Sequence, residues 1–284
     1  MDVNAILSEA KKLGASDVHF IPGIKPKLRV NRDLIELEQY EVINKDDILE
    51  VYDYFLKGNV DKDAYFREHK VLDTSAEFED IRLRVNIAYS DGLPVITTRL
   101  IRNELPTYEE LGVPDIVRRM TNQTQGLILV TGKTNSGKST TLNALINYIN
   151  DNENKKILTL ESPVEYKHKC KKSIIVQKEV GVGGDVPAYS IGTKNSLRED
   201  CDILVIGEIR DKETMEAAIE TAESGHLVIG TLHTKSCAET VDRMINFYEV
   251  GDQSQVKYLI ASLLKLVISQ RLIKNKRGTL SLVP

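Results

Sequence analysis

Residues 126–140 read GLILVTGKTNSGKST and carry the strongest structural signal in this chain of 284 residues. The apolar run at 126–130 predicts a strand that is buried on both faces. Residues 132–139 match the pattern G-x-x-x-x-G-K-[ST], and residues 140–150 continue at helical spacing. A strand, a glycine-rich loop and a helix in this order predict a phosphate-binding loop rather than a surface turn that happens to share the pattern.

Each residue type in this loop has a chemical reason to be there. Glycine lets the backbone curl so that its N–H groups face phosphate oxygens, and asparagine tolerates positive φ. The lysine neutralises the outer phosphates of ATP, and the serine hydroxyl is a ligand for Mg²⁺. The residues that we expect at the nucleotide are Gly132, Thr134, Asn135, Ser136, Gly137, Lys138, Ser139 and Thr140.

Three more continuous apolar runs follow the loop, at 157–160, 203–206 and 227–229. Helical segments separate them, so the pattern predicts a parallel sheet built from strand-helix-strand units, the arrangement of an α/β P-loop domain. The apolar residues of 256–268 recur at helical spacing and predict a helix.

The chain ahead of the loop has a different pattern. A helical stripe lies at 6–13, another helix is expected at 46–56, and apolar and polar residues alternate at 81–87. We therefore expect a smaller α+β domain at 1–104, a linker at 105–112 where proline and glycine interrupt both periodicities, and the P-loop domain at 113–284.

Carboxylates end two of the predicted strands. Glu208 follows the run 203–206, and Glu161 follows the run 157–160. At a strand tip near the phosphates, Glu208 could act as a general base toward water and contact Mg²⁺ through water, while Glu161 could orient the same water. The alternative for each is an exposed carboxylate at a strand end.

Two histidines and two arginines are further candidates. His226 and His233 bracket the strand at 227–229, where a neutral imidazole could sense the terminal phosphate; a hydrogen-bonded core histidine is the alternative. Arg84 and Arg99 could stabilise charge on the transferred phosphoryl group at a domain or subunit interface, or they could be solvated residues on strand faces. The basic run 167–172 predicts a solvated hairpin.

Composition excludes several classes of protein. Lys plus Arg number 38 and Asp plus Glu number 42, so a net charge of −4 offers no overall basic field for nucleic acid or anionic lipid. Three cysteines without a CxxC pair argue against a disulfide framework or a zinc site. The amino-terminal stretch has no signal-peptide core, and no run of about 18 apolar residues occurs. We expect a cytoplasmic protein that meets a membrane only through a partner.

Four segments occur in the order of the secretion-type motor ATPases of type II and type IV secretion, and the chain resembles that family. They are GKTNSGKST, ILTLESPVEY, SLREDCDILVIGEIRD and TAESGHLVIGTLHT, known in the family as the Walker A, Asp, Walker B and His boxes. ASDVHF and RLRVN resemble the family's amino-terminal domain. The chain is most similar to the pilus retraction (twitching motility, PilT-like) branch, because it starts at the ASDVHF domain and lacks a paired-cysteine insertion.

The resemblance implies a RecA-like P-loop domain behind a PAS-like α+β domain, with ATP and Mg²⁺ as ligands. It implies that Lys138 and Ser139 serve phosphates and metal, that Glu208 is the catalytic carboxylate assisted by Glu161, and that His226 and His233 belong to the nucleotide-sensing segment. It also implies that Arg84 and Arg99 approach the phosphates.

At the level of the assembly, the resemblance implies a homohexamer at the inner face of the cell membrane that acts on a pilus platform protein, without nucleic acid. A pilus-assembly or type II secretion ATPase is one alternative, and a ring subunit that binds nucleotide but turns it over weakly is another. Ser162 stands where the family has an aspartate, Cys201 stands where it has a proline, and the chain ends at Pro284, before the family's carboxy-terminal helices.

Overall fold

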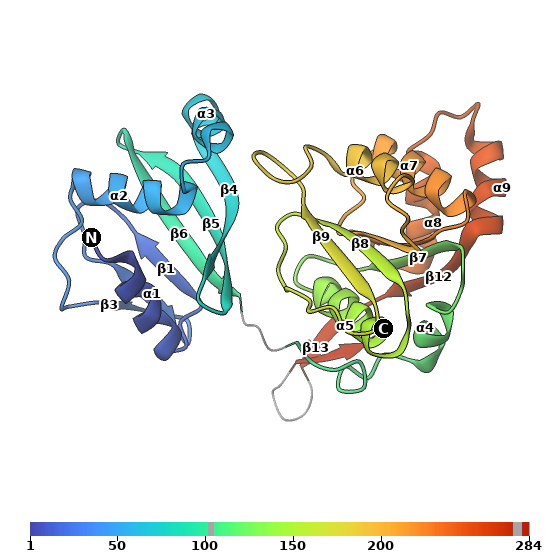
Figure 1. Ribbon diagram of the computed structural model, residues 1–284, viewed down its shortest axis with the longest axis horizontal. Helices are drawn as coiled ribbons and strands as arrows, with labels where there is room; N and C mark the ends of the chain where they lie inside the picture. Colours follow the sequence, from blue (N-terminus) through green and yellow to red (C-terminus); the bar gives the residue numbers. More distant parts are fainter. Residues whose placement is uncertain (102–104, 275–279, 284) are drawn as a thin grey trace. The chain divides into compact units, whose positions relative to one another are not determined.

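The computed structural model describes residues 1–101, 105–274 and 280–283. Backbone contacts divide the chain into two compact units, Met1–Glu104 and Leu105–Pro284 (Figure 1). Each unit is built on a six-stranded sheet of its own. Within the described residues, no helix has the length and apolar character needed to cross a membrane.

The first unit is an α+β domain built on an antiparallel sheet. Its strands run in the order β3-β2-β1-β6-β5-β4. The bounds are α1 Val3–Lys12, β1 Asp17–Phe20, β2 Lys27–Val30, β3 Asp33–Glu36, α2 Lys45–Leu56, α3 Val60–His69, β4 Val71–Phe78, β5 Ile81–Ser90 and β6 Leu93–Ile101.

One face of this sheet carries the core of the first unit. Burial alternates along β4 and β5, so every second side chain packs under the helices and the others face outward. Ile6 and Leu7 of α1 and Phe55 of α2 are buried against Phe20 and Ile87 of the sheet. The two predicted helices and the alternating strand are confirmed, and α3 and β4 are elements that the sequence analysis did not predict.

The second unit is the α/β domain that the continuous apolar runs predict. Its sheet has the order β12-β7-β11-β10-β8-β9, and every one of these neighbours pairs in parallel. The strands are β7 Gly126–Thr131, β8 Lys156–Glu161, β9 Ile174–Glu179, β10 Ile203–Ile206, β11 Leu227–Leu232 and β12 Leu264–Ser269, and β13 Arg271–Lys274 and β14 Leu280–Val283 form a separate hairpin. The helices are α4 Asp115–Met120, α5 Lys138–Asn152, α6 Tyr189–Ser196, α7 Lys212–Glu223, α8 Cys237–Asn246 and α9 Gln253–Leu263.

Helices cover both faces of this sheet, which explains why its strands lack alternation. Leu127 and Leu129 of β7 belong to one core cluster with buried residues of α7, α8 and α9. Ile128 and Val130, which point the other way, pack in a second cluster with buried residues of α4 and α5. A strand covered on both sides excludes water from every side chain, so apolar residues are favoured throughout.

Three predictions of local structure differ from what is found. The helix expected over 256–268 ends at Leu263, and the remainder is β12, paired with β7. The expected linker 105–112 lies in the second unit, where Tyr108 is 5% exposed in the core. The basic run 167–172 is a loop that leads into β9, which pairs in parallel with β8, and not a hairpin.

Candidate active site

The predicted site residues of the second unit gather mainly at one edge of its sheet. The carboxyl ends of parallel strands meet at the same edge, and the glycine-rich loop follows β7 there. Glu161 ends β8, Glu208 follows β10 by two residues, and His233 directly follows β11. Because β7, β11, β10 and β8 are neighbours in this order, these residues follow successive strands.

The loop has the backbone that its residue types predict. Asn135 has φ of 60° and Gly137 has φ of 85°, both in the left-handed region. A Cβ on Gly132 would lie 2.4 Å from the Oγ of Ser136 and 2.6 Å from the carbonyl oxygen of Gln270. Gly132 is therefore required by close packing inside the loop.

Lys138 lies inside the curve of the loop. Its side chain is buried, and Nζ donates to the carbonyl oxygens of Gly132 at 2.9 Å and Lys133 at 3.1 Å. Burial lowers the pKa of Lys138, and the negative charge of Glu208 opposes that shift. Ser139, in the first turn of α5, is exposed.

Gln270 is a loop contact that the sequence analysis missed. Gln270 is fully buried, and its Nε2 donates to the carbonyl oxygen of Ser136 at 2.9 Å. Its backbone N–H donates to the carbonyl oxygen of Thr131. A pocket of about 360 Å³ lies against the loop and is lined by Gly132, Lys133, Thr134, Asn135, Ser136, Lys235, Gln270, Arg271 and Leu272. No local pattern marks Gln270, because the bond spans 134 residues.

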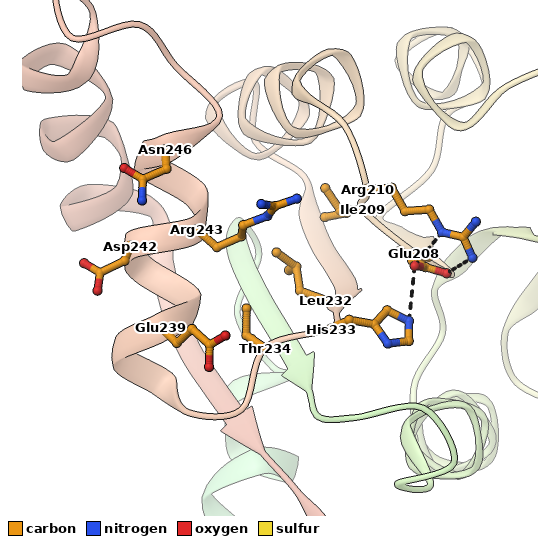
Figure 2. Close-up of a pocket in the computed structure, with 10 residues that line it drawn as sticks. All are labelled: Glu208, Ile209, Arg210, Leu232, His233, Thr234, Glu239, Asp242, Arg243 and Asn246. Atoms are coloured by element: carbon orange, nitrogen blue, oxygen red, sulfur yellow. Dashed lines mark hydrogen bonds and ion pairs between the residues drawn. The ribbon is translucent and has the colours of Figure 1, made fainter.

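Glu208 is held between a cation and an imidazole (Figure 2). Arg210 donates to its carboxylate at 2.6 Å, and Nε2 of His233 lies 3.1 Å from Oε1. Burial alone would raise the pKa of Glu208, but the hydrogen bond and charge of Arg210, with the charges of His233 and Lys138, bring it below its ordinary value. The carboxylate is therefore ionised at neutral pH.

The three residues Glu208, Arg210 and His233 line a second pocket, of about 380 Å³. Its opposite wall is α8, from which Glu239, Asp242, Arg243 and Asn246 project (Figure 2). This wall was not part of the sequence prediction, since charged residues on a helix ordinarily indicate a solvated face.

Glu161 is more enclosed than Glu208. Its side chain is 7% exposed, and its Oε1 accepts hydrogen bonds from the Thr159 hydroxyl at 2.6 Å and from Nε2 of Gln177 at 3.1 Å. A carboxylate held by fixed donors has a defined orientation, as a water-orienting group requires.

The structure does not bring His226 to this edge. His226 precedes β11 and therefore lies at the amino end of the sheet, with the length of β11 between it and His233. Its Nδ1 lies 3.0 Å from the Ser224 hydroxyl and 3.3 Å from the carbonyl oxygen of Thr221, so its contacts are to the turn after α7.

Arg84 and Arg99 are cross-strand partners on β5 and β6 in the first unit. Both are exposed, and Nε of Arg99 donates to Oδ1 of Asp17 at 2.9 Å. Asp17, on β1, pairs with Arg99 from the other side. The three charged residues Asp17, Arg99 and Arg84 are therefore neighbours across three adjacent strands.

The oxygen donors at the sheet edge fit Mg²⁺ rather than a softer metal. Mg²⁺ keeps several waters and binds phosphate with one or two protein oxygens, so the Ser139 hydroxyl and the ionised Glu208 carboxylate are a suitable donor set. In the part of the chain that the structure describes, no group of three or more His, Cys, Asp or Glu side chains could hold a metal by itself.

Comparisons with known proteins agree on one family. The model of the type II/IV secretion system protein family matches residues 1–279. The type IV pilus retraction ATPase PilT of Pseudomonas aeruginosa is 38% identical over 279 residues, which cover 98% of this chain and 80% of that protein. A twitching motility protein of Neisseria gonorrhoeae is 40% identical over 214 residues, 75% of this chain and 57% of that protein.

The fold is similar to that of a solved pilus motor. The crystal structure of the pilus retraction motor PilT with bound ADP superposes with a TM-score of 0.92 and 36% identity, covering 99% of this chain and 81% of that one. This likeness extends over both units, and it confirms the α/β domain preceded by a smaller α+β domain.

Proposed function

The chain belongs to the type II/IV secretion system protein family, and from this premise we propose that it is a Mg²⁺-dependent motor ATPase that powers type IV pilus retraction. The relatives named as a pilus retraction ATPase and a twitching motility protein support the assignment to retraction. The ADP bound to the similar pilus motor supports a nucleotide ligand.

The loop binds the phosphates of ATP through Lys138, through its inward backbone N–H groups and through the amino end of α5. Ser139 and, through water, Glu208 would hold Mg²⁺, which would offset the negative charge of the phosphates. Glu208 accepts the proton of the attacking water, His233 holds that carboxylate in place, and Glu161 orients the water. Arg84 and Arg99 complete the charge around the phosphates at a domain or subunit interface.

One observation carries this proposal: the ionised carboxylate of Glu208 shares a sheet edge with the buried ammonium of Lys138. A general base must be unprotonated, and a phosphate ligand must be positioned before the nucleotide arrives. Arg210 and His233 hold the Glu208 carboxylate, and the carbonyl oxygens of Gly132 and Lys133 hold the Lys138 ammonium in position.

The assembly belongs to the same proposal. A homohexameric ring at the inner face of the cell membrane would act on a pilus platform protein, and ATP hydrolysis would change the angle between the two units. Mass photometry of the chain with an ATP analogue and Mg²⁺ tests the ring, since a persistent monomer contradicts it.

Phosphate release by purified Glu208→Gln, measured beside affinity for a fluorescent ATP analogue, tests the catalytic part. We expect turnover to fall at least about 100-fold with affinity retained, because the amide keeps the shape of the side chain but accepts no proton. Glu213→Gln is the matched control, since Glu213 is an exposed carboxylate in the first turn of α7. Unchanged turnover in Glu208→Gln would contradict the assigned role.

The alternatives have distinct outcomes. A wild-type chain that binds ATP without releasing phosphate is a structural ring subunit, and turnover stimulated by DNA or RNA indicates a nucleic-acid translocase. Deletion of the gene in the source organism separates the two pilus roles: loss of a retraction motor should leave pili that do not retract, whereas loss of an assembly motor should leave none.

A further inference from the structure

A series of hydrogen bonds connects Glu161 to the loop that precedes β9. Nε2 of Gln177, on β9, donates to Oε1 of Glu161 at 3.1 Å and to the carbonyl oxygen of Tyr166 at 2.7 Å. Oε1 of the same amide accepts the backbone N–H of His168 at 2.9 Å. Gln177 therefore fixes the Glu161 carboxylate and the backbone at His168 with one planar group.

His168 continues this series toward the P-loop helix. It lies in the basic segment 167–172, but its ring is turned inward while Lys167 and Lys169 are exposed. Its Nε2 lies 2.7 Å from Oδ1 of Asn143 and its Nδ1 lies 2.6 Å from Oδ1 of Asn147. Burial lowers the pKa of His168 to about 4, so the ring is neutral at physiological pH.

The neighbouring bonds determine which ring nitrogen carries the proton. Nδ2 of Asn143 donates to the carbonyl oxygen of Ser139 at 2.9 Å, so the Oδ1 of Asn143 faces the ring as an acceptor. A neutral imidazole has one N–H, which is therefore on Nε2. Nδ1 is then an acceptor. The Asn147 amide, whose Oδ1 lies 2.6 Å from Nδ1, can donate to it only if the amide plane is rotated by a half-turn.

Three asparagines on one face of α5 form hydrogen bonds to the loop before β9. Among their described contacts, one asparagine also bonds to the first turn of α5. Asn143, Asn147 and Asn150 are spaced four and three residues apart, so they share a face. Asn150 donates to the carbonyl oxygen of Lys169 at 2.8 Å and accepts from the backbone N–H of Lys171 at 2.9 Å. Asn150 lies beyond the reach of Ser139, whereas Asn143 bonds to it directly.

We propose that His168 is a positioning residue for ATP hydrolysis: its ring holds the first turn of α5 at Ser139 through Asn143, and by fixing the loop it keeps its own backbone N–H on Gln177, which holds the Glu161 carboxylate. This inference rests on the function proposed above. Its physical basis is that reacting groups must be held to within a fraction of an ångström, and that a displacement of about 1 Å can reduce the rate roughly 100-fold. The segment that the sequence marks only as a basic run thereby links two parts of the site.

The test uses the full chain and four variants. His168→Leu removes both ring contacts, Asn143→Ala removes the link to Ser139 from the helix side, and His168→Gln keeps an N–H donor. Asn150→Ala is the matched control, because it loosens the same loop from the same helix without touching Ser139.

We expect His168→Leu and Asn143→Ala to lower kcat for Mg²⁺-ATP by at least about 10-fold while KM changes less than about threefold, since the orientation of groups rather than ATP binding is lost. His168→Gln should restore kcat to within about threefold. Asn150→Ala should keep wild-type kcat even where its Tm falls. Without nucleotide, backbone amides 141–143 should exchange hydrogen faster in the first two variants than in Asn150→Ala.

Two results overturn the proposal. One is wild-type kcat and wild-type amide protection in either His168→Leu or Asn143→Ala, with folding verified by circular dichroism; if His168→Leu does not fold, Asn143→Ala decides. The other is an equal loss of kcat in Asn150→Ala. A wild-type chain without any turnover refutes the proposed function instead, and amide exchange then decides the positioning role alone.

Discussion

Nε2 of His233 lies 3.1 Å from Oε1 of Glu208, although the two residues follow different strands, β11 and β10. The contact exists because these strands are parallel neighbours that end at the same edge. Arg210 holds the same carboxylate at 2.6 Å. Glu208 is thus fixed from two directions, and the charges around it overcome the effect of its burial.

Arg210→Ala should make ATP turnover more sensitive to acid. In the proposed mechanism turnover requires the ionised Glu208, so it should fall as pH drops through the pKa of that group. In the wild type this pKa is below its ordinary value, and without Arg210 the effect of burial is opposed less, so the acid limb should move to higher pH. The measurement is kcat/KM for ATP against pH.

Lys212→Ala is the control for that profile, because it removes one positive charge two residues away, from a side chain paired with Glu216. Its acid limb should coincide with that of the wild type. An unmoved limb in Arg210→Ala would show that Arg210 does not control the ionisation of Glu208.

Gly132→Ala should weaken nucleotide binding. The added Cβ meets the carbonyl oxygen of Gln270 at 2.6 Å, and that backbone atom cannot rotate away as a side chain can. Overpacking of this kind costs about 1–3 kcal/mol, and where the cost falls on the nucleotide-bound loop it lowers the affinity for an ATP analogue by roughly 5- to 150-fold. Gly251→Ala, where nothing lies within 4 Å, should bind as the wild type does. Equal affinities in the two variants, measured by fluorescence titration, would refute this account of the loop.

Arg99→Ala should destabilise the first unit, because it leaves the buried Asp17 carboxylate with one donor fewer. We expect a loss of about 1–2 kcal/mol in unfolding free energy by urea titration. Arg84 is the exposed cross-strand neighbour of Arg99. Arg84→Ala should lower the free energy of unfolding by less than about 0.5 kcal/mol. A similar cost for both would mean that the Arg99–Asp17 pair contributes nothing to the fold.

The same pair predicts a dependence on pH. Burial would raise the pKa of Asp17, but hydrogen bonds from Ser16 and Arg99 and the charge of Arg99 lower it below its ordinary value. A lowered folded-state pKa stabilises the fold above the unfolded value of about 3.9, and this contribution is lost as pH falls through the folded value. The difference in stability between wild type and Arg99→Ala should therefore narrow below about pH 4.

The sequence predicts the α/β domain well because its signals are local. Strands buried on both faces require continuous apolar runs, and a glycine-rich loop before a helix has few other uses. α3 escaped prediction because Phe66 is its one buried residue among those described, so it shows no apolar stripe. β4 was not predicted because two of its buried positions hold Thr74 and Ala76. Larger apolar residues there would have made the alternation of apolar and polar residues visible in the sequence.

The remaining differences come from contacts that no local pattern reveals. Residues 264–268 continue a helical spacing, yet pairing with β7 makes them a strand, since tertiary contacts override local preference. His226 and His233 lie in one sequence motif, but the strand between them puts them at opposite ends of the sheet. His168 lies in a lysine-rich segment, which by itself indicates a solvated loop. The asparagines that contact it, Asn143 and Asn147, are polar residues that by sequence resemble an ordinary solvated helix face.

Gln270 connects β13 directly to the phosphate loop, because its side chain donates to Ser136 and β13 begins at the next residue. A change in the position of β13 would therefore reach Ser136 through a single side-chain amide.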